Sequence, residues 1–225
     1  MAGKRGFLYE GRVFNKLKSK NLVPAGVTPA GPDASKPDAI FLFNKKNYNL
    51  EVKLDLATDY GQGTLNYKNG SWELGGADTK EAVEMRKILT TVGAVKFANT
   101  SWGYQGAPNK GTVENKDITD EMVLEDYRRF KDKFLSVPLS SLFNYYAAKN
   151  TYYIQIGGYG MYYMAGNPGN LPVPKFNGSM KLRIRLKRGS STPIYNYRFT
   201  TALQVVQKPS ISKFDIDKSM NFLVA

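Results

Sequence analysis

Two short apolar runs joined by a polar turn form the most constrained stretch of this 225-residue chain. The first run covers residues 39–43, the polar segment covers 44–47, and the second run covers 48–54. Runs bounded in this way predict the two strands of a β-hairpin. Residues i and i+2 of a strand project to the same face, so Glu51 and Lys53 point together while the intervening aliphatic side chains point into a core. The hairpin therefore has one charged face and one apolar face.

An aspartate stands at the entrance of the first strand, within the dipeptide Pro37-Asp38. Asp38 and Glu51, helped by the backbone carbonyl of Val52, offer the hard oxygen ligands that Mg²⁺ prefers, and we expect Mn²⁺ to substitute for it. Lys53 would orient or activate the attacking water and neutralise developing charge. This order of groups predicts a metal-dependent nuclease, which hydrolyses phosphodiester bonds with Mg²⁺. The alternative interpretation is a hairpin whose charges only keep an exposed face solvated.

These residues resemble the motif of the PD-(D/E)XK nuclease superfamily, which includes type II restriction enzymes, Holliday-junction resolvases and many phage and repair nucleases. The resemblance covers roughly residues 5 to 74 and places Asp38, Glu51 and Lys53 in the catalytic site. It implies that Glu10, on a helix ahead of the motif, completes the acidic cluster, and that Gln62 positions the substrate or the lysine. The implied fold is α/β, restriction-endonuclease-like, with a mixed central sheet flanked by helices and a β-rich basic C-terminal region.

Two residue types are absent from the chain, which contains no histidine and no cysteine. The absence of histidine excludes Ser-His-Asp and Cys-His catalysis and acid-base work by imidazole. The absence of cysteine excludes disulfides, thiolate nucleophiles and cysteine-ligated zinc. Carboxylate and lysine chemistry around a hard cation is the hydrolytic chemistry that the composition leaves open.

The excess positive charge of the chain is concentrated in its C-terminal part. Eleven of the 32 basic residues lie between Lys133 and Lys213, and that stretch contains no aspartate or glutamate. Residues 181–187 alternate cations with aliphatic residues, which predicts a strand with one basic face. Because no acidic residue in the stretch pairs with these cations, we assign nucleic-acid binding to six of them: Lys181, Arg183, Arg185, Lys187, Arg188 and Arg198. The alternative is a solvated edge strand protected by charge.

The remaining patterns outline the organisation of the chain. We expect helices over residues 6–20, 79–91 (capped by Asp78), 120–135 and 139–149, and a long loop over 99–115. Further strands are expected at 64–67 or 71–74 and over 152–156, 159–164, 180–188 and 194–206. We divide the chain into a nuclease-like α/β core, residues 1–135, and a β-rich basic region, residues 136–225, packed on the core as one unit.

Several expectations concern partners and function. No apolar run approaches the length of a membrane span, so we expect no membrane partner and a cytoplasmic protein of a bacterial, archaeal or virus-infected cell. Cutting both strands of DNA favours a homodimer. The sequence leaves open a site-specific endonuclease of restriction, homing or phage type and a resolvase of Holliday junctions or other branched DNA. It also leaves open a non-catalytic nucleic-acid-binding protein that retains the fold, and a basic structural protein of a virion or nucleoid.

Overall fold

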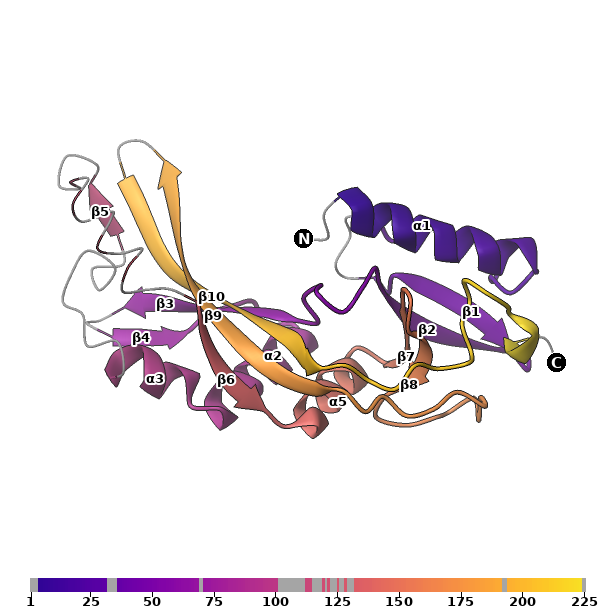
Figure 1. The fold of residues 1–225 in the computed structure, drawn as a ribbon. Coiled ribbons are helices and arrows are strands. Elements are labelled where there is room, and N and C mark those ends of the chain that lie inside the picture. The colour runs from indigo at the N-terminus through magenta and orange to yellow at the C-terminus, as the bar shows by residue number, and fades with distance from the viewer. Residues whose placement is uncertain are drawn as a thin grey trace. The chain divides into compact units, whose positions relative to one another are not determined.

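The computed structural model describes residues 4–31, 36–68, 71–100, 112–114, 119, 121, 125, 128, 132–191 and 194–223. These residues form a mixed α/β protein with two β-sheets and four α-helices in the described part (Figure 1). The chain divides into two compact units. Unit 1 comprises Met1–Thr58, Pro138–Ser179 and Val205–Ala225, and unit 2 comprises Asp59–Val137 and Met180–Gln204. This division differs from the expected one between residues 135 and 136, because each unit is built from segments distant in sequence.

Unit 1 is built on a four-stranded mixed sheet. Its strand order is β1-β2-β7-β8, in which β2 and β7 are parallel and the two outer pairs are antiparallel. Its elements are α1 (Lys4–Ser19), β1 (Ala39–Phe43), β2 (Lys46–Lys53), α5 (Leu139–Ala148), β7 (Thr151–Ile156), β8 (Gly160–Tyr163) and the 3₁₀ helix η3 (Asn221–Leu223). The predicted helices over 6–20 and 139–149 and the strands at 152–156 and 159–164 are therefore confirmed, with small shifts at their ends.

The predicted β-hairpin is confirmed, and its second strand begins two residues earlier than expected. Asn44 and Lys45 close it with φ angles of 47° and 60°. Two consecutive positive φ angles are typical of the two-residue turns that match the twist of a hairpin. The register pairs Ala39 with Leu50. Position 38 consequently lies opposite Glu51, on the same face of the sheet.

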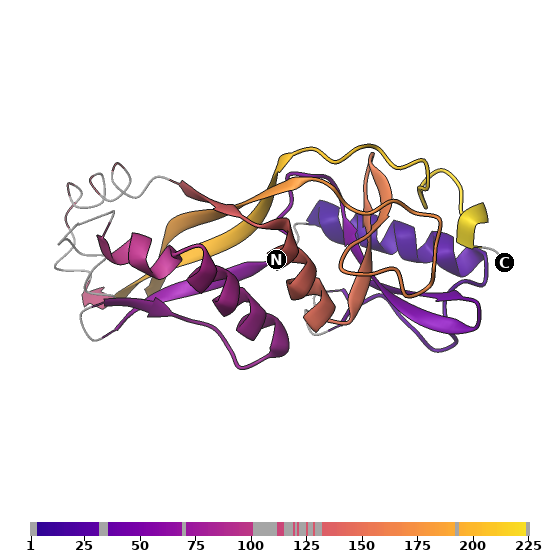
Figure 2. The same cartoon turned by 90° about the horizontal axis from the view of Figure 1, so that it is seen from below.

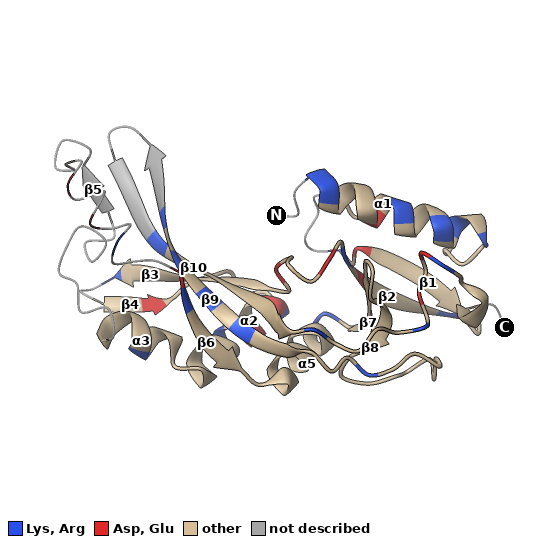
Figure 3. Ribbon diagram, viewed as in Figure 1, with Lys and Arg blue, Asp and Glu red and all other residues tan. Residues whose placement is uncertain are grey.

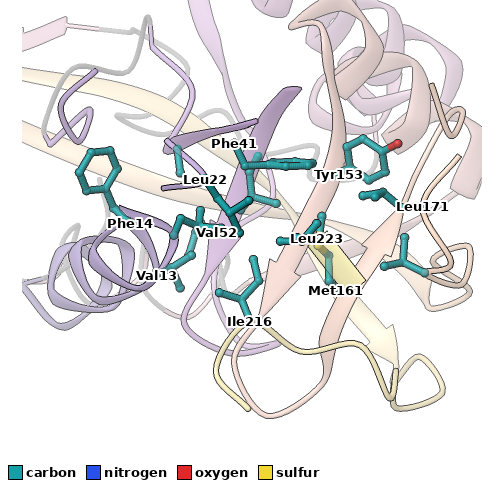
Figure 4. Packing of buried hydrophobic residues seen from close by; sticks show 14 of the residues in the cluster. Val13, Phe14, Leu22, Phe41, Val52, Tyr153, Met161, Leu171, Ile216 and Leu223 are labelled. Atoms are coloured by element: carbon teal, nitrogen blue, oxygen red, sulfur yellow. The ribbon is translucent and has the colours of Figure 1, made fainter. Parts of the chain in front are cut away.

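The core of unit 1 lies between α1 and one face of this sheet. Helix α1 buries Val13, Phe14 and two further side chains against the hairpin, and Val52 is 2% exposed in the same cluster (Figure 4). Phe41 and Leu50 belong to this cluster as well. Because these strand residues face α1, their neighbours Glu51 and Lys53 project from the opposite face.

The C-terminal segment fixes α1 in place. The hydroxyl of Tyr9 donates to Oδ2 of Asp217 at 2.7 Å, and the ammonium of Lys16 donates to the carbonyl of the same residue. Gln155, on β7, donates to Oδ1 of Asp215 at 2.8 Å. Burial and the Asp217 carboxylate raise the pKa of Tyr9 above its usual range, so the phenol stays a donor. The contacts of Asp217 with Tyr9 and Lys16 hold the C-terminal segment against the first helix.

A close approach of two backbones joins the ends of the parallel strands. The N–H of Gly157, directly after β7, donates to the carbonyl of Lys53 at 2.9 Å. A Cβ atom at Gly157 would lie 2.2 Å from the carbonyl oxygen of Leu54, which leaves no room for a side chain. Glycine at this position therefore allows β2 and β7 to end side by side.

Unit 2 contains a sheet of order β4-β3-β10-β9-β6, with β5 also paired to β10. Its elements are β3 (Gln62–Lys68), β4 (Ser71–Leu74), α2 (Lys80–Thr91), α3 (Ala94–Thr100), β5 (Thr112–Glu114), β6 (Lys133–Val137), β9 (Ser179–Ser191) and β10 (Ile194–Gln207), the last two extending into unit 1. Helices α2 and α3 lie along one face of this sheet (Figure 2). On that face, a Cβ at Gly63 would contact Met85 and Leu89 of α2.

Several local expectations for unit 2 need correction. The cap of α2 is Thr79, whose hydroxyl accepts from the N–H of Ala82 at 3.3 Å, whereas Asp78 pairs with Arg86 at 3.0 Å. Residues 133–137 form β6, so the predicted helix over 120–135 is wrong at its end, and most of its remainder lies outside the described residues. The predicted loop over 99–115 lies largely outside them too, with β5 inside it. The strands expected as alternatives at 64–67 or 71–74 are both present, as β3 and β4.

In the part of the chain that the structure describes, no helix combines the length and apolar character that crossing a bilayer needs.

Candidate active site

The two carboxylates of the predicted motif lie together on the face of the unit 1 sheet opposite α1. Asp38 precedes β1, and its Oδ2 accepts the N–H of Val52 at 2.8 Å. Glu51 lies opposite in the hairpin and is 4% exposed. The charge of Glu51 acts to raise the pKa of Asp38, and both carboxylates act to raise the pKa of Lys53. The hairpin thus places two acidic groups in one largely buried site, as its strand periodicity predicts.

Glu51 is held by groups from two parts of the chain. Nζ of Lys53, two residues along the same strand, lies 2.7 Å from Oε1. The hydroxyl of Tyr146 donates to the same oxygen at 3.3 Å. Nζ of Lys149, at the end of α5, lies 3.3 Å from Oε2. Both oxygens of this carboxylate are therefore engaged by an ammonium group, and we call Asp38, Glu51, Lys53 and Lys149 the charged quartet.

The quartet separates the pKa values of its two acids. Burial, followed by repulsion from Glu51, raises the pKa of Asp38 to about 7 against the stabilising effects of Lys53 and the Val52 N–H. Burial also acts to raise the pKa of Glu51, but the ammonium groups of Lys53 and Lys149 outweigh it and lower that pKa to about 2. Near neutral pH, Glu51 is ionised and Asp38 is poised to exchange its proton, for example for a metal ion.

The two lysines of the quartet stay protonated. Burial, the largest single effect, acts to lower the pKa of Lys53 and of Lys149, but the combined attraction of Glu51, Asp38 and Tyr145 outweighs it and the net pKa of each lysine is raised. A lysine with a raised pKa is a hydrogen-bond donor and a positive charge, and does not accept a proton from water. A protonated Lys53 can orient the attacking water and neutralise developing charge, as predicted. It cannot activate that water as a general base.

The other two predicted site residues differ in their surroundings. Glu10, on α1, is partly buried, and burial together with the charge of Glu51 raises its pKa, with Lys53 acting in the opposite direction. Glu10 is therefore electrostatically coupled to the motif. Gln62 belongs to unit 2, where its amide donates to Asp59 at 3.0 Å. Its predicted role toward the substrate or the lysine stays a prediction.

The donor set of the quartet fits a hard cation bound by few protein groups. Among the described residues, no group of three or more His, Cys, Asp or Glu converges as a metal site. Mg²⁺ commonly uses only one or two carboxylates and keeps several of its waters. Asp38 and Glu51 supply two such carboxylates, and the proton on Asp38 near pH 7 is one that a cation can displace. The pair therefore suits a partly hydrated Mg²⁺ or Mn²⁺ and not a closed site.

Sequence reasoning missed two residues of this site, Tyr146 and Lys149. Their helix and the following strand are both predicted from local patterns. What brings them to Glu51 is the parallel pairing of β2 with β7, in which Glu51 lies beside Ile154. No local signal specifies that pairing, because nearly a hundred residues separate the two strands.

The basic strand of unit 2 has the predicted alternation but different neighbours. Leu182 and Ile184 are fully buried in β9, as expected. The edge-strand interpretation is wrong, because β9 lies between β10 and β6. The expectation that its cations have no acidic partners is also wrong for two of them. Arg183 pairs with Asp59 at 3.3 Å, and Arg185 makes a two-pronged contact with Asp132 at 2.6 and 2.5 Å.

Other cations on this surface are also described. Nζ of Lys181 lies 3.8 Å from the centre of the Phe134 ring, and Lys187 on β9 and Arg198 on β10 are exposed. Figure 3 shows basic positions along β9 and β10. The side chain of Arg188 lies outside the described residues. Asp59 accepts hydrogen bonds from Gln62, Gln204 and Arg183, which places these three side chains on one face. That face of the unit 2 sheet lies opposite α2 and α3. We call it the basic face and assign to it Lys181, Arg183, Arg185, Lys187 and Arg198.

Comparison of the chain with protein-family models, with curated proteins and with solved structures finds no match.

Proposed function

We propose that the protein is a Mg²⁺-dependent endodeoxyribonuclease of the PD-(D/E)XK type. The observation that carries this proposal is the buried convergence of Asp38 and Glu51, with Lys53 at 2.7 Å from the latter. The mixed sheet of unit 1, with α1 packed on one face and α5 leading into β7, supports a restriction-endonuclease-like arrangement. Asp38 and Glu51 are the proposed metal ligands, and the carbonyl of Val52 is proposed to assist them.

The chemistry follows from the charges at the site. A bound Mg²⁺ supplies an activated water and stabilises charge on a phosphate oxygen. The Lys53 ammonium, held near the carboxylates, donates to the attacking water or to the phosphate and offsets developing negative charge. Glu10 adds negative potential from α1 and favours cation binding. The low exposure of Glu51 strengthens each of these interactions by excluding water.

We assign DNA contact to the basic face of unit 2. Lys181, Arg183, Arg185, Lys187 and Arg198 are the described cations, and the proposal includes Arg188. An arginine has five N–H donors, so the contact of Arg185 with Asp132 leaves others to meet a phosphate. Such contacts position a duplex without reading its sequence. A homodimer, which would present two active sites to the two strands, is part of the proposal.

One observation favours a second candidate function. Both oxygens of Glu51 are already engaged by lysines, so the site is internally neutralised without any metal. A protein that keeps the fold only to bind nucleic acid would have such an arrangement. This non-catalytic alternative predicts equal DNA binding in Mg²⁺ and in EDTA.

The test is cleavage of supercoiled plasmid and of a four-way junction in Mg²⁺, in Mn²⁺ and in EDTA. We expect Lys53→Met to lower metal-dependent cleavage at least about 100-fold, because it removes a positioned charge from the site. Lys46→Met is the matched control, since Lys46 is an exposed lysine at the other end of β2. The preferred substrate decides between endonuclease and resolvase. DNA binding without cleavage in either metal supports the non-catalytic alternative.

A further inference from the structure

Lys149 is the member of the charged quartet to which the proposed reaction gives no role. Its side chain is 17% exposed and its Nζ lies 3.3 Å from Oε2 of Glu51. The residue caps α5, where its N–H donates to the carbonyls of Tyr146 and Ala147. The hydroxyl of Thr151 donates to its carbonyl at 3.3 Å. The backbone of Lys149 is thus fixed at the helix end, and its ammonium is aimed at the carboxylate.

The two lysines of the quartet engage different oxygens of Glu51. Lys53 engages Oε1, which also accepts from Tyr146, and Lys149 is the cation on Oε2. A divalent cation bound by Glu51 must approach one of these oxygens. On Oε2 the ammonium of Lys149 lies at 3.3 Å, whereas on Oε1 the ammonium of Lys53 lies at 2.7 Å and the hydroxyl of Tyr146 at 3.3 Å. The longer contact of Lys149 makes Oε2 the oxygen from which an ammonium is more easily displaced. A divalent cation that binds Oε2 would take the position of the Lys149 ammonium.

We propose that Lys149 is a positioning residue that occupies Oε2 of Glu51 in the metal-free protein and competes with the divalent cation for that oxygen. This inference rests on the proposed function of the quartet as a metal site. A cation that takes Oε2 displaces the ammonium from the carboxylate. The affinity of the site for metal is then set by Lys149 as well as by the two acids, and Glu51 is never left as an uncompensated buried charge.

Two features at the end of α5 allow a metal ion to replace the ammonium of Lys149 on Glu51. The lysine side chain is long and carries its charge on a flexible stem, so it can leave Glu51 while its backbone stays capped. Its Nζ also lies 5.4 Å from the centre of the Tyr146 ring and 5.9 Å from that of Tyr145. Aromatic faces at this distance attract a cation, so the two rings can stabilise the ammonium after it leaves the carboxylate.

The experiment is a Mn²⁺ titration of the full chain by calorimetry at one pH and ionic strength. Lys149→Gln removes the charge but keeps a hydrogen-bond donor, and we expect it to bind Mn²⁺ at least about tenfold more tightly, because a repelling charge close to the ion is lost. Lys149→Arg keeps the charge and is expected to stay within about twofold of wild type. Tyr146→Phe removes a neutral donor from the same carboxylate and is expected to change the affinity by less than about threefold.

Asp38→Asn separates this inference from the proposed function. If Mn²⁺ binding depends on Asp38 but Lys149→Gln binds no more tightly than wild type, the competition is overturned and the metal site stands. If no variant shows Mn²⁺ binding that depends on Asp38, the metal site and the inference both fail. A merely structural role of Lys149 predicts lower stability of Lys149→Gln with unchanged or weaker metal affinity.

A second measurement on the wild type covers the case in which Lys149→Gln does not fold. In ¹⁵N-lysine NMR spectra, a buried ammonium held by a carboxylate exchanges its protons slowly, and its resonance is assigned by its loss in Lys149→Arg. We expect addition of Mg²⁺ to shift this resonance or to remove its protection. A Lys149 resonance that is unchanged at saturating Mg²⁺ overturns the proposal.

Discussion

Both units place basic side chains against carboxylates, but the two sets of ion pairs differ in their access to water. In unit 1, the side chains of Glu51, Lys53 and Lys149 are 6, 15 and 17% exposed. In unit 2, those of Arg185 and Asp132 are 46 and 29% exposed. The exposed pair has the shorter contacts, while the buried quartet has the larger displacements of acid pKa values.

The difference shows that burial, and not contact distance, decides what an ion pair does. At the surface, water screens the Arg185 contact, which lowers the pKa of Asp132 and adds little stability. In the quartet, two carboxylates share a site from which water is largely excluded, so one keeps its proton toward neutral pH and the other needs two ammonium groups. The same residue types form a chemically poised site in one unit and a solvated pair in the other.

The largest expected effect breaks this comparison at Glu51. Glu51→Gln leaves the ammonium groups of Lys53 and Lys149 buried without their counter-charge, so we expect it to lower the free energy of unfolding by about 3 to 5 kcal/mol. Arg185→Gln, which also replaces one charged partner by an amide, is expected to cost less than about 1 kcal/mol. Urea unfolding followed by circular dichroism measures both, with separate transitions fitted separately. Equal losses in the two variants would remove the distinction.

A smaller effect concerns the pH dependence of stability at Asp38. The folded-state pKa of about 7 lies above the usual aspartate value, so the folded protein binds this proton more tightly than the unfolded chain. Stability from this group is present at pH 4 and is lost as the pH rises toward 7. We therefore expect Asp38→Asn in EDTA to exceed wild type in stability at pH 8, by roughly 1 to 4 kcal/mol, and to equal it near pH 4.

Asp132→Asn is the control with the opposite sign. Its side-chain bond to Arg185 lowers the pKa of Asp132, so the stability that this group adds is present above the usual aspartate pKa and is lost in acid. We expect the variant to be slightly less stable than wild type at pH 8, by under about 1 kcal/mol, and equal to it in acid. Parallel pH profiles for the two asparagine variants would contradict the assigned difference between the units.

The smallest effect is expected on the basic face, where single exposed charges act through screened contacts. Lys187→Gln should weaken binding of a DNA duplex several-fold at low salt and reduce the slope of log affinity against log salt by about 1. Lys46→Gln, an exposed lysine on β2 of unit 1, is the control with no expected change in slope. Fluorescence anisotropy over a salt series in EDTA measures both. An unchanged slope for Lys187→Gln would remove β9 from the proposed contact surface.

The sequence by itself determined the local parts of this protein. Alternation with a period of two gave Glu51 and Lys53 a common face, and the same rule separated the cations of β9 from Leu182 and Ile184. The hairpin register then places Asp38 opposite Glu51. The hairpin, helices α1 and α5 and most C-terminal strands followed from short patterns. Each of these features depends on residues that are close together in the sequence. A short stretch of sequence is therefore enough to predict it.

Only the tertiary structure decided which distant segments meet. The parallel pairing of β2 with β7 brings Lys149 to Glu51, and the placement of Asp132 beside β9 gives Arg185 its partner. The tertiary structure also brings three separate segments together in unit 1. The choice of a strand's neighbour depends on how the whole chain buries its apolar faces, and many pairings satisfy the same local alternation. For that reason the acids of the site were readable from the motif, whereas the second lysine was not.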